Sequence, residues 1–119
     1  MDDSPLERVR RLCLALPEVS ERPSHGAPTF FIREKKTFVT YVDNHHGDGR
    51  LAIWCNAPPG LQGSLVDEDP VRYFAPPYVG VRGWVGARLD RDPDWARIED
   101  LILLAYRVTA PKRLIERLR

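Results

Sequence analysis

Apolar residues recur at helical spacing near the two ends of this chain, whereas the segments between them alternate apolar and polar residues. A period near 3.6 indicates a helix with one buried face, and a period of two indicates a strand with one buried face. The pattern predicts the order helix, three strands, short helix, two strands, long helix. This order is typical of a two-layer α+β fold, with helices on one face of a largely antiparallel sheet.

The first helix has a clear start signal. Ser4 is a favourable N-cap, Pro5 suits the first helical position, and Glu7 completes a capping box. The apolar stripe that follows is Leu6, Val9, Leu12, Cys13 and Leu16. Pro17 ends the helix because it cannot donate to the backbone ladder. We expect the polar segment 18–28 to be a loop.

Three short segments then carry the alternation of strands. They are 29–33, 37–42 and 50–55. The second has two faces, one with Phe38, Thr40 and Val42 and the other with Val39 and Tyr41. Because only three residues separate the first two segments, we expect a hairpin there.

Prolines and glycines divide the second half of the chain. We expect a short helix at 60–66, strands at 71–74 and 83–89, and a long helix that opens at Asp92-Pro93-Asp94. The stripe of the long helix is Ile98, Leu101, Ile102, Ala105 and Val108. Pro111 starts a further turn or two.

The composition fits one globular domain. The chain has 119 residues, of which 43% are hydrophobic and 29% charged, so we assign residues 1–119 to a single domain. The formal net charge is only +1. Dedicated nucleic-acid domains are usually more basic, so any binding of nucleic acid must come from local patches.

The cysteines and the N-terminal residues bear on location. Cys13 falls on the apolar face of a helix and Cys55 in an apolar strand, so we expect two buried thiols rather than a disulfide. The first residues are acidic and then basic, without the apolar core of an export signal, and no apolar run is long enough to span a bilayer. We therefore expect a cytoplasmic protein with no membrane partner.

The residues suggest no enzyme, cofactor or metal. Ser20, Ser24 and Ser64 lack the glycine-flanked turn of a serine nucleophile, and no glycine-rich stretch matches a phosphate loop. Adjacent rings such as those of His45 and His46 rarely aim at one ion, so we expect a solvated loop there. We expect no catalytic residues.

His25 allows two interpretations. Beside Gly26, in the loop that leads into the sheet, it can hold the loop by hydrogen bonds. It can also act in a small-molecule site, which requires a concave pocket where His25 converges with other polar groups.

Basic and aromatic residues are interleaved over residues 71–91, where four arginines are opposed by one acid. This mixture suits a nucleic-acid backbone with stacked bases, although arginines that cover core aromatics are also normal in a sheet. Two lysines at the expected hairpin tip add to it. The candidate nucleic-acid contacts are Lys35, Lys36, Arg72, Tyr78, Arg82, Trp84 and Arg88.

Trp84 is expected on the open face of the sheet. Val85, Ala87 and Leu89 make the better match to the helices, and a two-layer domain has one well-buried sheet face. We therefore expect Trp84 to be partly exposed. Flanking glycines leave space for a large ring to pack closely.

Several segments together resemble a known family. They are LALPEVSERPSHGAPTFFI, KTFVTYVD, RLAIWCNAP, RYFAPPYVGVRGWVGARLD and PDWARIEDLILLAYRVTAPKRL. This stretch, from about residue 14 to residue 114, resembles the MmcQ/YjbR family. The resemblance implies a small α+β fold, likened to CyaY-like and secretion-chaperone-like folds, and DNA binding, a label that the family often carries. It implies no catalytic residue set.

Three functional hypotheses follow. The first is a non-enzymatic cytoplasmic domain that binds DNA weakly and in a salt-sensitive way. The second is a protein- or peptide-interaction module, with an exposed apolar patch and a homodimer. The third is a small-molecule-binding protein that uses His25.

Overall fold

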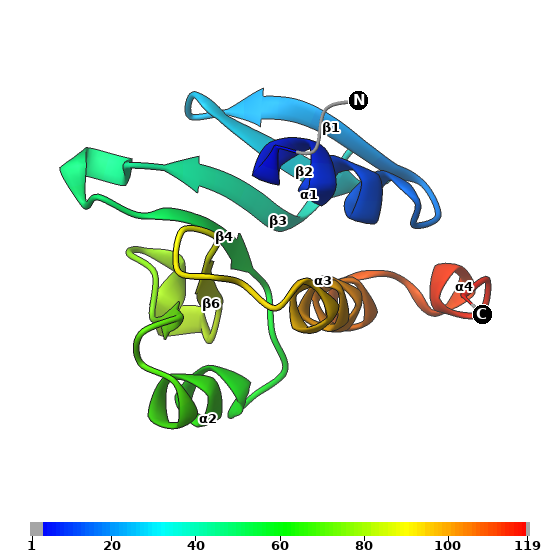
Figure 1. Ribbon diagram of the computed structural model, residues 1–119. Coiled ribbons are helices and arrows are strands. Elements are labelled where there is room, and N and C mark those ends of the chain that lie inside the picture. Colours follow the sequence, from blue (N-terminus) through cyan, green and yellow to red (C-terminus); the bar gives the residue numbers. More distant parts are fainter. Residues whose placement is uncertain (1–3, 119) are drawn as a thin grey trace.

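An antiparallel sheet organises the chain, with the strand order β1-β2-β3-β4-β6-β5 (Figure 1). The computed structural model describes residues 4–118. Its strands are β1 (Val19–Ser24), β2 (Ala27–Ile32), β3 (Lys36–Asp43), β4 (Leu51–Cys55), β5 (Tyr73–Phe74) and β6 (Val85–Arg88). Its helices are α1 (Pro5–Leu14), α2 (Leu61–Glu68), α3 (Trp95–Thr109) and α4 (Lys112–Ile115), with the 3-10 turns η1 (His45–Gly47) and η2 (Val79–Arg82).

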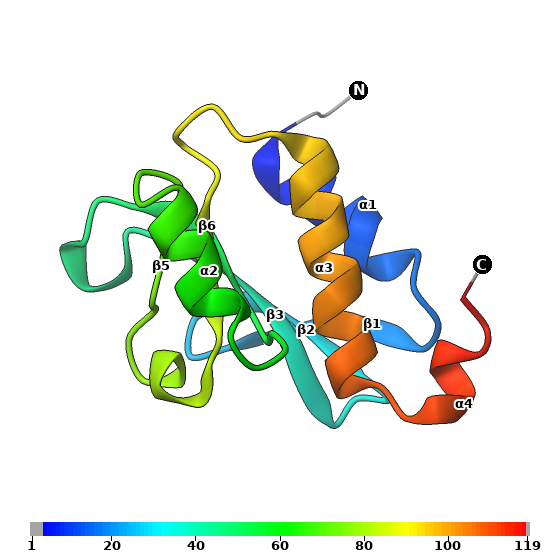
Figure 2. The ribbon, with the colours of Figure 1, turned by 90° about the horizontal axis from the view of Figure 1, so that it is seen from below.

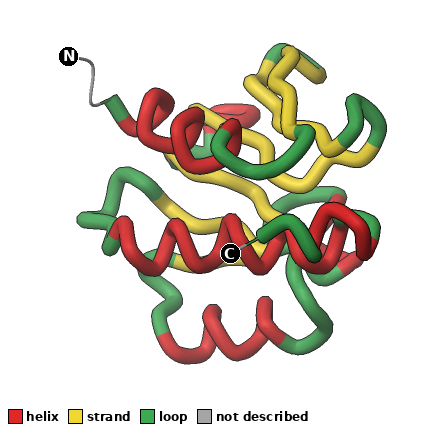
Figure 3. The backbone as a smooth tube through the Cα atoms, turned by 90° about the vertical axis from the view of Figure 1, so that its right-hand side faces the viewer, coloured by secondary structure: helices red, strands yellow, loops and turns green. Residues whose placement is uncertain are grey.

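The helices gather on one side of the sheet. Figure 2 looks onto them with the strands behind, and Figure 3 shows α3 running between α1 and α2. The main core lies between these helices and the sheet, and Tyr106 of α3 packs edge to face on Phe38 of β3. The α+β class and the order of the predicted elements are confirmed, with one strand more than predicted.

The extra strand is β1, where the sequence predicts a loop. All six of its residues pair with β2, from Val19 opposite Ile32 to Ser24 opposite Ala27. Its sequence, VSERPS, is polar and contains Pro23 because β1 is an edge strand, and edge strands commonly carry charges and proline that discourage further pairing. The apolar alternation that identifies inner strands is therefore absent.

A β-bulge changes the predicted faces of β3. Phe30 pairs with Val39 but Phe31 pairs with Thr37, so Phe38 is the extra residue. Phe38 and Val39 both reach the main core, whereas strict alternation would place Phe38 with Thr40. The prediction for Phe38 is wrong for this reason, since a single strand carries no signal for its register with a neighbour.

The helix start signals are partly confirmed. Ser4 Oγ accepts a hydrogen bond from the backbone N–H of Glu7 at 3.2 Å, as expected of an N-cap. The sequence predicts that the long helix opens at Asp92. In the structure the cap is Asp94, whose side-chain oxygen accepts a hydrogen bond from the backbone N–H of Ala96 at 3.0 Å.

Among residues 4–118, none of the helices combines the length and apolar character needed to cross a membrane.

The opposite face of the sheet carries a second, smaller cluster of buried residues. It consists of Val42, Ala52, Trp54, Phe74 and Trp84, with Val79 packed against it. The Phe74 ring lies against Gly86, where a Cβ would clash with three of its ring carbons. The expectation that a glycine makes space for a large ring is thus met at Gly86. We call this side the open face, because α1 and α3 pack on the other.

Candidate functional site

A cleft of about 780 Å³ lies on the open face. Its floor is set by the sheet register, which aligns Thr29, Thr40 and Trp54 across β2, β3 and β4. Three loops rise around this floor and supply the remaining walls. The lining residues are Ser24, His25, Ala27, Thr29, Thr37, Thr40, Val42, His45, His46, Trp54, Tyr78, Val79, Arg82 and Trp84.

The first wall is the turn between β1 and β2. Ser24 pairs with Ala27, which leaves His25 and Gly26 as a two-residue turn with φ values of 51° and 78°. Positive φ at both positions is the geometry of a type I′ turn, which matches the twist of a hairpin. His25 is exposed at its tip and makes no side-chain hydrogen bond within residues 4–118. The turn is therefore held by its backbone rather than by the imidazole.

The second wall is the η1 loop between β3 and β4. Asn44 closes this loop, because its N–H donates to the Arg50 carbonyl at 2.7 Å and its side-chain oxygen accepts from the Gly49 N–H at 2.8 Å. This closure sets His45 over the floor. The His45 ring meets Trp54 with 4.9 Å between centroids, and His46 with 4.1 Å.

His45 is not the solvated residue that the sequence predicts. Its ring is half-buried, and its Nε2 atom is buried with no hydrogen-bond partner in the described part of the chain. A buried nitrogen without a partner costs stability, and here that cost falls at the wall of the cleft. His46 is exposed, as expected for this loop.

The third wall is the segment that leads into η2. Tyr78 has φ 65° and ψ −64°, and the N–H of Val79 donates to the Pro77 carbonyl at 2.7 Å. These values define a rare γ-turn with positive φ at its centre. For a residue with a side chain, such a conformation costs on the order of 1–3 kcal/mol and is found disproportionately at ligand-binding sites. It holds the Tyr78 ring, which is 72% exposed, at the rim of the cleft.

Arg82 is the one arginine of the lining. It is exposed and forms no ion pair within residues 4–118. The lining has no aspartate or glutamate. The charged and titratable lining groups are thus Arg82, Tyr78 and three imidazoles, an arrangement that favours neutral or anionic ligands.

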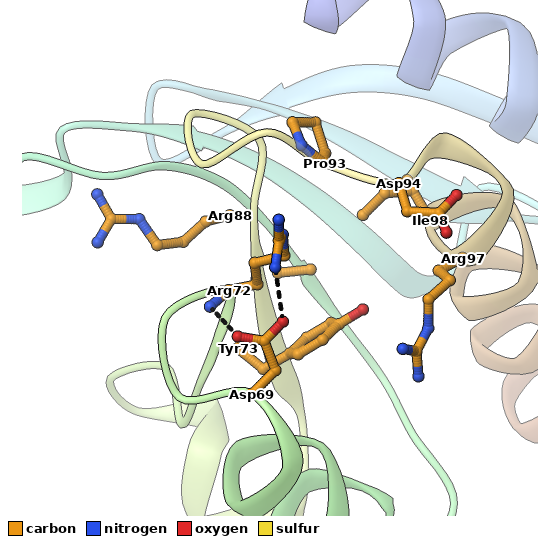
Figure 4. Close-up of a pocket in the computed structure, with 9 residues that line it drawn as sticks. Asp69, Arg72, Tyr73, Arg88, Pro93, Asp94, Arg97 and Ile98 are labelled. Atoms are coloured by element: carbon orange, nitrogen blue, oxygen red, sulfur yellow. Dashed lines mark hydrogen bonds and ion pairs between the residues drawn. The ribbon is translucent and has the colours of Figure 1, made fainter.

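Arg72 and Arg88, two other candidate nucleic-acid contacts, lie in a separate groove of about 230 Å³ (Figure 4). Each is held by an acid. Arg72 contacts Asp69 at 3.0 Å, and Arg88 forms two hydrogen bonds with Asp90 at 2.9 and 3.0 Å. Hydrogen bonds from these guanidinium groups lower the pKa values of Asp69 and Asp90. Their positive charge is therefore largely compensated.

The candidate contacts do not form one surface. Lys36 is the first residue of β3. Arg88 pairs with Ala52 of β4, which in turn pairs with Val42, six residues after Lys36 along β3. At about 3.3 Å per residue this is about 20 Å along the strands. The structure brings together Tyr78, Arg82 and Trp84 at the cleft, and leaves Lys35 and Lys36 exposed at the distant hairpin turn.

Trp84 differs from its predicted exposure. It lies on the open face, as predicted, but it is 6% exposed and belongs to the second cluster. The prediction of partial exposure is wrong because the η2 segment folds back over this face, where the Trp84 N–H donates to the Val79 carbonyl at 3.3 Å. Trp84 is part of the base of the cleft and does not offer a free ring face.

The thiols lie outside the cleft. Cys13 and Cys55 are free and buried in the main core, as the sequence predicts. Burial raises the pKa of both thiols, so neither is a ready nucleophile. Within residues 4–118, no three His, Cys, Asp or Glu side chains are grouped so that they could hold a metal ion.

Much of the cleft was not apparent in the sequence. The sequence predicts Trp54, Thr37 and Thr40 only as strand residues. Its alternation does place Trp54 on the same face as Ala52, and Thr40 on the same face as Val42. Strand register decides that Thr40 lies opposite Trp54 and that both lie beneath the three loops, and a single strand carries no signal for register. The sequence hypothesis for His25 requires a concave pocket where His25 meets other polar groups, and His25 does line such a cleft.

Comparison with known proteins agrees with the fold. The crystal structure of Deinococcus radiodurans protein DR2400, with the domain described as DUF419, is similar at a TM-score of 0.74 and 16% sequence identity, and the match covers 94% of this chain and 86% of that chain. This likeness shows the fold alone. No curated protein matches the chain. A family model described as YjbR matches residues 14–108, which is most of the chain. The chain therefore belongs to the YjbR family, as its sequence resemblance indicates.

Proposed function

We propose that this chain is a binding domain, not an enzyme, and that the open-face cleft holds a small-molecule ligand. One observation carries the proposal: three separate loops bring imidazole, phenol and guanidinium groups over one floor of threonines and tryptophan. Ligand sites are usually clefts of roughly 300–1,000 Å³ with apolar walls and a few convergent polar groups. The cleft matches this description in volume and in lining.

The backbone around the cleft supports a binding role. Tyr78 is held in a costly conformation, and the His45 ring is fixed by its packing on Trp54. Rings that are positioned before a ligand arrives lose less entropy on binding. The walls thus offer preorganised rings and hydroxyls, whereas the buried thiols, the obvious nucleophiles, lie across the sheet.

A cleft-filling variant tests this proposal. Thr40 is half-buried at the floor, and a tyrosine there would occupy the space of a ligand. The matched control is Ser64→Tyr, on the exposed side of α2. A chemically diverse fragment library would be screened by ligand-observed NMR against the wild type, Thr40→Tyr and Ser64→Tyr, after thermal unfolding has shown that all three fold.

We expect the main group of fragments to bind the wild type and Ser64→Tyr alike, and to lose at least about tenfold in affinity with Thr40→Tyr, a loss of about 1.4 kcal/mol. A library in which no ligand distinguishes Thr40→Tyr from Ser64→Tyr contradicts the proposal.

DNA binding is a second candidate, favoured by one observation: Tyr78 and Arg82 are both exposed on the same rim. A ring and a guanidinium so placed suit a single strand, with the base on Tyr78 and the phosphate on Arg82. The compensated charges of Arg72 and Arg88 reduce the support for a wider duplex interface. The fluorescence anisotropy of labelled single-stranded and duplex DNA at low salt tests this candidate.

Binding should fall steeply with salt and be weakened by Arg82→Gln more than by Arg88→Gln. If neither form of DNA binds at roughly tens of micromolar protein, where even non-specific complexes are detectable, DNA is not the ligand.

A further inference from the structure

We propose that the cleft selects an aromatic anion, meaning a planar ring that carries a carboxylate, sulfonate or phosphate. This inference rests on the proposed function and names the chemical class of its ligand. Three independent features of the cleft lead to it: its charge, its exposed ring, and its unpaired polar groups.

The charge of the lining is positive. It comes from Arg82, and the lining contains no carboxylate. Arginines elsewhere in the described chain are often engaged by acids, and those in ion pairs include Arg10, Arg33, Arg72, Arg88, Arg97 and Arg117. Arg82 keeps its donors available at a place where an anion can reach them. Guanidinium groups bind carboxylates and phosphates through paired hydrogen bonds.

The aromatic part is indicated by Tyr78. Its ring is held at the rim by the γ-turn and stands at 87° to the His45 ring, with 6.0 Å between centroids. Trp54 and Trp84 are only 8% and 6% exposed and close the base of the cleft. A planar ligand can therefore stack on Tyr78 and meet the His45 and Trp54 rings at its edge.

Unpaired polar groups complete the site. The His45 Nε2 is buried without a partner, so a ligand in the cleft pairs with it, and removes the cost of that orphaned atom, only when the ring turns toward the cleft. The hydroxyls of Thr37 and Thr40 form no hydrogen bond within residues 4–118. By contrast, the Thr29 hydroxyl already donates to the Ala27 carbonyl at 3.0 Å. The free hydroxyls can donate to the anionic group or to a heteroatom in the ring.

A matched set of four ligands separates the ring from the charge. The set is 2-naphthoate, 2-naphthalenemethanol, 2-naphthylmethylammonium and cyclohexanecarboxylate. Isothermal titration calorimetry would be run on the full chain and on three variants. Arg82→Gln removes the cleft arginine, Arg113→Gln removes an exposed arginine on α4 as a control for net charge, and Thr40→Tyr blocks the cleft.

We expect 2-naphthoate to bind about tenfold more tightly than the alcohol, a difference of about 1.4 kcal/mol, because hydrogen bonds between two charged groups are stronger than those to a neutral hydroxyl. The ammonium and the non-aromatic acid should bind more weakly still. Arg82→Gln should abolish the preference for naphthoate, and Arg113→Gln should preserve it. Thr40→Tyr should remove binding of naphthoate.

Other outcomes overturn the inference in recognisable ways. If the alcohol or the ammonium binds in the cleft as tightly as naphthoate, the cleft does not select anions. If cyclohexanecarboxylate equals naphthoate, the ring is irrelevant. If Arg82→Gln and Arg113→Gln lose the same affinity for naphthoate, Arg82 does not contact the anion. If none of the four binds while other library fragments compete for the cleft, only this inference falls. If no fragment of any class uses the cleft, the proposed function falls with it.

Discussion

The imidazole of His45 packs edge to face on the indole of Trp54, with 4.9 Å between ring centroids and 75° between ring planes. This contact ties a loop to the centre of the sheet. It also places an unpaired imidazole nitrogen beside the cleft rather than in solvent. Because such an atom costs stability, a substitution that removes it should raise stability while it weakens binding.

His45→Phe should separate the two properties. The variant keeps a ring on Trp54 and removes the orphaned Nε2, so we expect the free energy of unfolding to rise by roughly 0.5–1 kcal/mol. Binding of the cleft ligand should weaken at the same time. Ser64→Phe is the control for an added ring, because Ser64 is exposed on α2 and lies outside the cleft lining. Urea denaturation and ligand titration measure both effects, and a destabilised His45→Phe with intact binding would contradict them.

Trp84→Ala should cost about 3–5 kcal/mol, the usual range for a buried aromatic truncation. Trp84 is buried among Trp54, Phe74 and Val79, and its removal leaves a cavity in the second cluster. Trp95→Ala is a suitable comparison, since Trp95 is only half-buried at the start of α3 and should cost less. Chemical denaturation of both variants decides the matter, and similar small losses would mean that Trp84 is not core.

Gly86→Ala should destabilise the domain by about 1–3 kcal/mol through overpacking against Phe74. Phe74→Leu removes the ring that the new methyl group would meet. The double variant Gly86→Ala/Phe74→Leu should therefore lose less stability than the sum of the two single variants. Gly63→Ala in α2 is the control: its Cβ would meet open space, and alanine is the better helix former by up to about 1 kcal/mol. Equal and small effects at both glycines would show that Phe74 does not lie over Gly86.

The Arg88–Asp90 pair should make stability depend on acid pH. The hydrogen bonds from Arg88 lower the pKa of Asp90 in the folded state, so the pair stabilises the fold above the unfolded pKa of about 3.9. This contribution is lost as the pH falls through the folded pKa. Asp90→Asn should therefore cost about 0.5–1 kcal/mol at pH 7 and little at pH 2. Denaturation at both pH values tests it, and a cost that is independent of pH would contradict the pairing.

The elements with local signals could be predicted from sequence, and those set by contacts between strands could not. Ser4 caps α1 as expected, and the predicted stripe of α3 faces the core from Ile98 to Ala105. The prediction for Val108, the last residue of that stripe, is wrong, because Val108 is 42% exposed near the end of the helix. The sequence does not predict the polar edge strand β1, because its pairing comes from its neighbour and not from its own pattern. The bulge at Phe38 arises in the same way, from register.

The candidate site shows the same division. The sequence identified His25, Tyr78 and Arg82 as chemically interesting, but for different reasons and in different hypotheses. Their meeting at one cleft follows from a type I′ turn, a γ-turn and the closure of the η1 loop. Loop geometry of this kind depends on the sheet beneath it, so the convergence becomes visible only in the folded chain.

The three tryptophans provide the most direct test of the open-face cleft. In a ¹H–¹⁵N spectrum each indole N–H gives its own signal. Trp54 and Trp84 line the cleft, whereas Trp95 lies on the helical side under Arg8, whose guanidinium carbon is 4.3 Å from the ring centroid. On addition of a bound fragment, the Trp54 and Trp84 signals should shift in a saturable manner and the Trp95 signal should stay in place. Shifts confined to Trp95, or saturable binding that leaves Trp54 and Trp84 unchanged, would contradict a ligand site in this cleft.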